Sequence, residues 1–77
     1  MNKKEVQKRV SQHGKPLALN KFSWDEKTKT FASKENYLVI DFSNVSSCTI
    51  ISGYKSTQTA GDWSTQTSGD KVELKED

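Results

Sequence analysis

The sequence of 77 residues has little of what usually stabilises or activates a small protein. Cys48 is its one cysteine, so a disulfide within the chain is excluded. His13 is its one histidine and has no second soft ligand nearby in the sequence, which argues against a metal centre. Only 31% of the residues are hydrophobic, and no run approaches the ~20 apolar residues of a membrane span. We therefore expect no metal, no cofactor and no membrane association.

Catalytic groups are equally scarce. A single histidine beside the end of an expected helix offers no Ser-His-Asp set, and no glycine-rich phosphate loop is present. Cys48 falls at a position predicted to point inward, where it acts as a small hydrophobe. We predict that the protein is not an enzyme. No apolar run follows the basic start Met1-Asn-Lys-Lys, so we expect no export signal and a cytoplasmic location.

Charge is unevenly distributed along the chain. Residues 1–34 hold nine Lys/Arg and three acidic residues, a balance of +6, whereas residues 35–77 hold three Lys and seven acidic residues, a balance of −4. This asymmetry either steers the protein toward an acidic partner or reflects a solvated helix face and complementarity between subunits. An acidic body without an evident stacking platform argues against nucleic-acid binding.

The first 36 residues predict a helix and a hairpin that cap the rest of the chain. Asn2 is a suitable N-cap for a helix over residues 3–12, with Val6 and Val10 on one apolar stripe. A short strand is expected over residues 17–19. Aromatic residues on both sides of the polar turn at residues 25–29 predict a β-hairpin.

The remaining residues, 37–77, predict one further unit that repeats every eight residues. Residues 37–76 divide into the rows YLVIDFSN, VSSCTIIS, GYKSTQTA, GDWSTQTS and GDKVELKE. Repetition at a fixed period is typical of β-solenoids. The glycines that open three rows, Gly53, Gly61 and Gly69, are expected at corners that need a positive φ or a close backbone approach.

Alternation within each row predicts which side chains point inward. If the fourth and sixth members do, the inward pairs are Ile40/Phe42, Cys48/Ile50, Ser56/Gln58, Ser64/Gln66 and Val72/Leu74. Buried Ser and Gln are tolerable only when each bonds to the row above or below. With the apolar residues of the head, the predicted core is Val6, Val10, Leu17, Leu19, Phe22, Trp24, Phe31, Leu38, Ile40, Phe42, Cys48, Ile50, Val72 and Leu74.

The segment GYKSTQTAGDWSTQTSGD resembles the repeat of bacterial ice-nucleation proteins, whose sixteen-residue coils read roughly AGYGSTQTAGxxSxLT. It is also similar to short bacterial and phage proteins in which a non-repetitive head precedes such repeats. The resemblance covers about residues 45–70 and implies outward Thr-x-Thr pairs at Thr57/Thr59 and Thr65/Thr67, with Tyr54 as the coil tyrosine. Lys55 and Trp63 depart from the pattern at corners. Each face presents about one Thr-x-Thr rank, which is too little surface for ice binding.

These observations predict a mainly β domain with one N-terminal helix: a miniature β-solenoid of about five octets capped by the helix and hairpin. The alternative is an antiparallel β-meander with turns at residues 60–63 and 68–71. The two folds differ in one pairing. The solenoid requires parallel pairing of residues 56–59 with 72–75, and the meander requires antiparallel pairing of 56–59 with 64–67.

The expected function is a non-enzymatic protein–protein interaction module. One version, suggested by the resemblance to phage proteins, binds and inhibits a host defence complex, as anti-CRISPR proteins do. The alternative is a structural β-solenoid that self-assembles without an inhibitory role. We expect a homodimer, because the last row leaves a strand edge bearing Val72 and Leu74. Tyr54, Lys55 and Trp63 at the corners are further candidate contacts.

Overall fold

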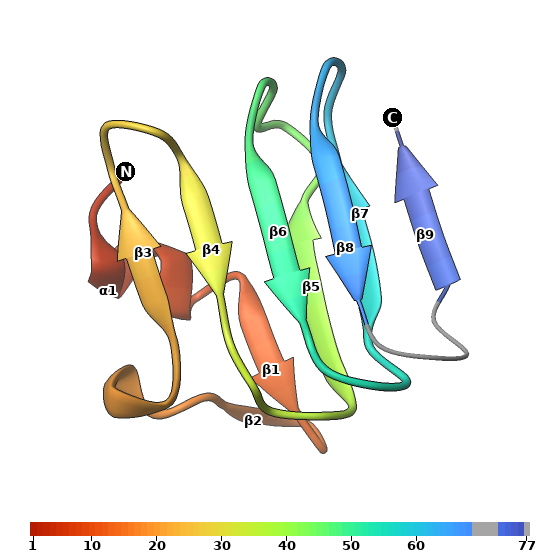
Figure 1. Ribbon diagram of the computed structural model, residues 1–77. Coiled ribbons are helices and arrows are strands. Elements are labelled where there is room, and N and C mark those ends of the chain that lie inside the picture. The colour runs from red at the N-terminus through yellow and green to blue at the C-terminus, as the bar shows by residue number, and fades with distance from the viewer. Residues whose placement is uncertain (69–72, 77) are drawn as a thin grey trace.

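The computed structural model describes residues 1–68 and 73–76, and its architecture is mainly β with one short N-terminal helix and two mixed sheets. Figure 1 shows the two sheets lying one behind the other. The elements are α1 Lys3–Gln7, β1 Val10–Gln12, β2 Lys15–Pro16, the 3₁₀ helix η1 Leu19–Lys21, β3 Ser23–Asp25, β4 Thr30–Ala32, β5 Leu38–Phe42, β6 Thr49–Ser52, β7 Thr57–Ala60, β8 Thr65–Ser68 and β9 Glu73–Glu76.

Successive octets alternate between the two sheets. The five-stranded sheet has the order β2-β1-β5-β7-β9, and the four-stranded sheet has the order β3-β4-β6-β8. The strands of the repeat pair in parallel with their sheet neighbours: β5 with β7 and β7 with β9 in one sheet, and β6 with β8 in the other, where β6 also pairs in parallel with β4 of the head. The meander required antiparallel pairing of β7 with β8. These two strands belong to different sheets, so that hairpin does not form.

The register of the parallel pairs corrects the phase of the first octet. Thr49 pairs with Thr65 and Thr57 with Glu73, which are steps of two octets. Val39, however, pairs with Thr57, a step two residues longer. The extra residues are Ser43-Asn44 between β5 and β6, so the first octet is 35–42 rather than 37–44. An insertion of two residues preserves which face each side chain takes, because the strand period is two.

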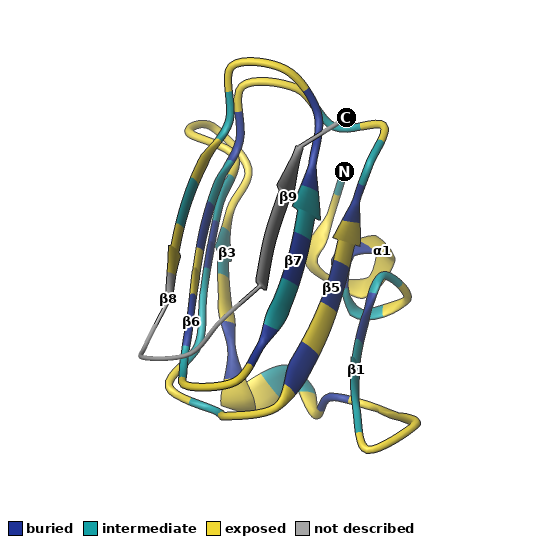
Figure 2. Cartoon of the chain, turned by 90° about the vertical axis from the view of Figure 1, so that its right-hand side faces the viewer, coloured by how far each residue is buried: buried dark blue, intermediate teal, exposed yellow. Residues whose placement is uncertain are grey.

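Burial follows the predicted alternation with one addition. The fourth and sixth members of the first three rows are buried. Those of the fourth row, Ser64 and Gln66, are half-buried. Figure 2 shows buried and exposed residues alternating along β5. The eighth members, Ser52 and Ala60, are buried as well, and the sequence analysis missed them. Val72 lies outside the described residues, and nothing is described of the side chain of Leu74.

An aromatic cluster forms the centre of the core. Phe31 and Phe42 are both 0% exposed and meet edge to face, with their ring centroids 6.1 Å apart. Phe22 stacks on Phe31, and Trp24 meets Phe42 edge to face at 5.7 Å. The predicted core is confirmed for Val6, Val10, Leu17, Phe22, Phe31, Leu38, Ile40, Phe42, Cys48 and Ile50. Leu19 and Trp24 are partly buried against this cluster.

The N-terminal helix is shorter than predicted. Asn2 caps it as expected, and its side chain accepts a hydrogen bond from the Glu5 amide while Glu5 bonds back. The helix ends at Gln7, and residues 10–12 form β1, which pairs antiparallel with β5. The prediction of a helix to residue 12 was wrong because β-branched Val10 packs opposite Ile40, and sheet pairing outweighs the helical stripe.

Two other predictions for the head have opposite outcomes. The strand over residues 17–19 was wrong: Leu17 is buried outside any strand, its carbonyl accepts a hydrogen bond from the Gln7 side chain, and η1 follows. The hairpin is confirmed as β3 and β4, with Trp24 paired opposite Phe31. Its turn is held by Asp25, whose carboxylate accepts the amides of residues 27 and 28.

Candidate interaction surface

The corners of the repeat hold large residues in a backbone conformation that favours glycine. The third members of the first four octets all have positive φ: Tyr37 59°, Ser47 55°, Lys55 56° and Trp63 64°. The glycines that open the rows have another role. A Cβ on Gly53 would lie 2.6 Å from the Glu35 carbonyl oxygen, and one on Gly61 would lie 2.9 Å from that of Val45. Close approach therefore explains these glycines, and Gly69 lies outside the described residues.

The corners gather at two opposite ends of the molecule. The β4–β5 and β6–β7 connections lie at one end, beside the β1–β2 turn (Figure 1). The β5–β6 and β7–β8 connections lie at the other end, with the β3–β4 turn and the N-terminus (Figure 1). Tyr54 and Lys55 therefore lie at one end, and Trp63 lies at the opposite end.

Four side chains come together at the first end, and we name His13, Tyr37, Tyr54 and Lys55 the aromatic corner. The rings of His13 and Tyr37 have centroids 5.7 Å apart, and those of Tyr37 and Tyr54 are 6.1 Å apart at an interplanar angle of 69°. The Lys55 ammonium lies 6.0 Å from the Tyr37 centroid and 5.4 Å from the Tyr54 centroid. Tyr37 is 45% exposed and Tyr54 36%. The corner is thus an exposed, semi-apolar surface with a cation beside it.

Backbone hydrogen bonds fix the aromatic corner in place. The Tyr37 amide donates to the Tyr54 carbonyl at 3.0 Å, and the Gly53 amide donates to the Glu35 carbonyl at 3.0 Å. The Asn36 side chain accepts the Tyr54 amide at 3.0 Å. These bonds join two consecutive corners, so the rings are held by the same ladder that joins the strands.

Charge at this end is predominantly positive. Among the described residues at this end, four exposed lysines stand against two carboxylates: Glu35, whose side chain pairs with Lys21 at 3.7 Å, and Glu73, which opens β9. The lysines are Lys15, Lys21, Lys34 and Lys55. The β3–β4 turn at the other end is balanced, with two acidic and two basic residues. Among the described residues, the first end thus combines clustered aromatic rings with an excess of positive charge.

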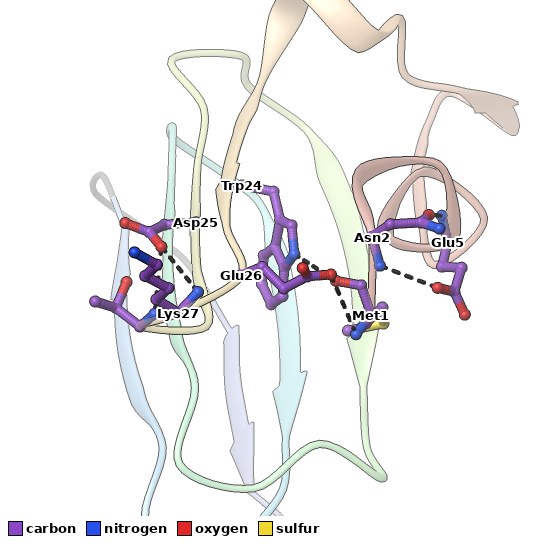
Figure 3. A network of polar contacts seen from close by, with 8 residues as sticks. Met1, Asn2, Glu5, Trp24, Asp25, Glu26 and Lys27 are labelled. Atoms are coloured by element: carbon purple, nitrogen blue, oxygen red, sulfur yellow. Dashed lines mark hydrogen bonds and ion pairs between the residues drawn. The ribbon is translucent and has the colours of Figure 1, made fainter.

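The opposite end uses its polar groups to hold the N-terminus. The Trp24 indole nitrogen donates to the Met1 carbonyl at 2.8 Å, and the Met1 ammonium lies 3.7 Å from Glu26 (Figure 3). A cavity of about 370 Å³ beside these residues is lined also by Glu5 and Arg9. Most of its polar groups already have protein partners, so their role is structural. Trp63, 89% exposed, also lies at this end.

The metal-ligating and titratable side chains of the described residues are dispersed. Among them, no group of three His, Cys, Asp or Glu is placed to hold a metal ion. Cys48 is buried, with its sulfur 3.3 Å from the Ser64 hydroxyl. The Ser43 side chain and amide hydrogen-bond to Asp41, which lowers the pKa of that carboxyl below its usual 3.8. No described helix is both long and apolar enough to cross a bilayer.

Sequence reasoning found half of the aromatic corner. It proposed Tyr54 and Lys55, which the structure places side by side, and it proposed Trp63, which lies apart from them. It missed His13 and Tyr37. The corrected octet phase identifies Tyr37, because Tyr37 and Lys55 then occupy equivalent positions before the parallel strands β5 and β7. His13 reaches the corner only through the β1–β2 turn, which was predicted as helix end.

Comparison with protein families, curated proteins and solved structures gives no match for this chain. The function proposed below therefore rests on the geometry and chemistry of the aromatic corner.

Proposed function

We propose that the protein is a miniature β-solenoid that acts as a non-enzymatic protein–protein interaction module and binds its partner through the aromatic corner. One observation carries this proposal: His13, Tyr37 and Lys55 are exposed and all have positive φ, at 53°, 59° and 56°. Bulky side chains are thus displayed at positions where glycine or asparagine would fold more easily.

The energetic cost of that display favours a binding role. A left-handed conformation costs a residue with a Cβ about 1–2 kcal/mol. The 45% of Tyr37 that stays exposed contributes nothing against this cost in the free protein, since burial stabilises only the area removed from water. Such strain is typical of sites where the side chain serves a function. Tyrosine is enriched among the residues that contribute most to protein interfaces, so a protein partner suits Tyr37 and Tyr54.

The regular coil supports the solenoid part of the proposal. Parallel pairing at a step of two octets, Thr49 with Thr65 and Thr57 with Glu73, is the pattern of a chain that winds alternately through two sheets. In such a coil the corners stack in line with the strands. Tyr37 and Tyr54, from consecutive coils, accordingly meet at one corner. The repeat thereby forms a rigid support for the exposed rings.

Site-specific photo-crosslinking tests the proposal. A benzophenone amino acid replaces Tyr54 in one version of the protein and Val39, 51% exposed on the outer face of β5, in a matched control. We expect irradiation in a bacterial lysate to give a discrete protein adduct from position 54 and none from position 39. An adduct at twice the 8.7 kDa chain mass would identify the partner as a second copy, the expected homodimer. Equal or absent adducts at the two positions would contradict the proposal.

A further inference from the structure

We infer that the aromatic corner recognises a carboxylate-rich segment of its partner protein. This inference rests on the proposed function and specifies the chemistry of the partner. The recognising groups are the Lys55 ammonium and the two tyrosines beneath it, which offer a charge, two hydroxyl donors and apolar ring surface in one place.

Lys55 is held ready for an anion rather than neutralised. The ion pairs of the described residues are Met1 with Glu26 and Lys21 with Glu35, and neither involves Lys55. Its ammonium instead lies within 6.0 Å of both tyrosine ring centroids. A cation over aromatic faces is attracted by the rings yet keeps its hydrogen-bond donors for another group. A carboxylate would form a charge-assisted hydrogen bond with it.

The lysines around the aromatic corner also favour a negatively charged partner. Lys15 lies next to the His13-Gly14 turn, and Lys34 lies in the β4–β5 connection that leads to Tyr37. Two carboxylates are described at this end: Glu35 is paired with Lys21 at 3.7 Å, and Glu73 opens β9 beside Thr57, so the four lysines remain in excess. The local field is therefore positive, and it would accelerate association with an acidic segment and repel a basic one.

The ring geometry favours an acidic protein over a nucleic acid. Single-stranded nucleic acid binds by stacking successive bases on open aromatic faces. Here Tyr37 and Tyr54 are inclined at 69° to one another, and Lys55 lies over both rings. The pair therefore offers no common stacking platform. Carboxylates need only a cation and hydrogen-bond donors, and Tyr37, Tyr54 and Lys55 are all exposed residues that carry such groups.

A peptide titration followed by amide NMR resonances tests the inference. The probes are a short blocked peptide of alternating Glu and Ala, the same peptide with Gln in place of Glu, and an oligothymidylate. We expect the Glu peptide alone to shift the resonances of His13, Tyr37, Tyr54 and Lys55. Lys55→Gln should weaken its binding about ten-fold, equivalent to about 1.4 kcal/mol. Lys55→Arg, which keeps the charge, should stay within about two-fold of wild type.

Lys29→Gln is the matched control. Lys29 is also an exposed lysine with positive φ, 54°, but it lies in the β3–β4 turn at the opposite end, so its loss should leave peptide binding unchanged. Equal shifts with the Glu and Gln peptides, or no shifts with either, would overturn the inference that the partner is acidic. The proposed binding role would still be supported by a crosslinked adduct at position 54. Tighter binding of oligothymidylate at the corner would overturn it in favour of nucleic acid. An unchanged resonance dispersion in each variant establishes that it is folded.

Discussion

Replacing Trp63 by glycine is expected to stabilise the protein, although it removes the largest side chain in the β7–β8 connection. Trp63 is 89% exposed, so its ring contributes almost no burial. Its φ of 64° costs a residue with a Cβ about 1–2 kcal/mol, and glycine avoids that cost. The greater freedom of glycine in the unfolded chain offsets about 0.5–1 kcal/mol of the gain. The midpoints of these two ranges leave a net stabilisation of about 0.5–1 kcal/mol.

Thermal unfolding of Trp63→Gly and Trp63→Ala measures this effect. For a domain of this size the stabilisation corresponds to a rise in Tm of about 2–8 °C. Alanine removes the same ring but keeps the Cβ and the strained φ, so its stability should lie within about 0.5 kcal/mol of wild type. The difference in stability between the two variants gives the free-energy cost of a Cβ at the positive φ of residue 63. If glycine melted at or below alanine, the strain argument for the corners would be refuted.

Four further changes probe the core, a corner, a carboxylate and the thiol. Phe42→Ala removes a ring that is 0% exposed, so the free energy of unfolding in urea should fall by about 3–5 kcal/mol; an unchanged midpoint would mean that Phe42 does not point inward. Gly53→Ala sets a Cβ 2.6 Å from a backbone carbonyl oxygen and should cost about 1–3 kcal/mol; a neutral effect would contradict the close approach. Because the pKa of Asp41 is lowered, its contribution to stability is present above the ordinary pKa of 3.8 and is lost as the pH falls through the folded value. Ser43→Ala removes the hydroxyl and keeps the amide, so it should raise that pKa, measured by NMR titration, and no change would exclude the Ser43 hydroxyl bond as its main cause. Cys48, 1% exposed, should react with a thiol reagent only on unfolding, and rapid reaction of the native protein would contradict its burial.

The sequence predicted the strands of the repeat because alternation depends only on local residues. Ile40 and Phe42 point inward as expected. The expectation for buried Gln58 is met in part: its Nε2 donates to the Ser52 hydroxyl at 2.6 Å and to the Thr67 carbonyl at 2.9 Å, whereas its Oε1 has no hydrogen-bond partner among the described residues. The predictions that were wrong concerned residues whose structure depends on pairing with segments distant in the sequence. Residues 10–12 carry a helical stripe, yet they form β1 because β5 offers an edge to pair with.

The aromatic corner was only half predictable for a related reason. Tyr54 and Lys55 are visible as corner residues of the third octet. Tyr37 seemed to open a strand because Ser43-Asn44 shifted the octet phase, and only the pairing of Val39 with Thr57 restores it. An inserted pair leaves inward and outward faces intact, so nothing in the alternation reveals the shift.

The central claim is that costly corner residues are retained for binding, and Lys55→Asn tests it most directly. Asparagine tolerates the left-handed φ of 56° far better than lysine, whereas the exposed cation–π contact that is lost stabilises by about 0.5–1 kcal/mol. The relief of backbone strain should therefore equal or exceed the loss of the cation–π contact, so Lys55→Asn should be at least as stable as wild type. The account predicts a Tm at or above that of wild type together with a clear loss of the crosslinked adduct from position 54. Full adduct yield in the stable Lys55→Asn variant would contradict it.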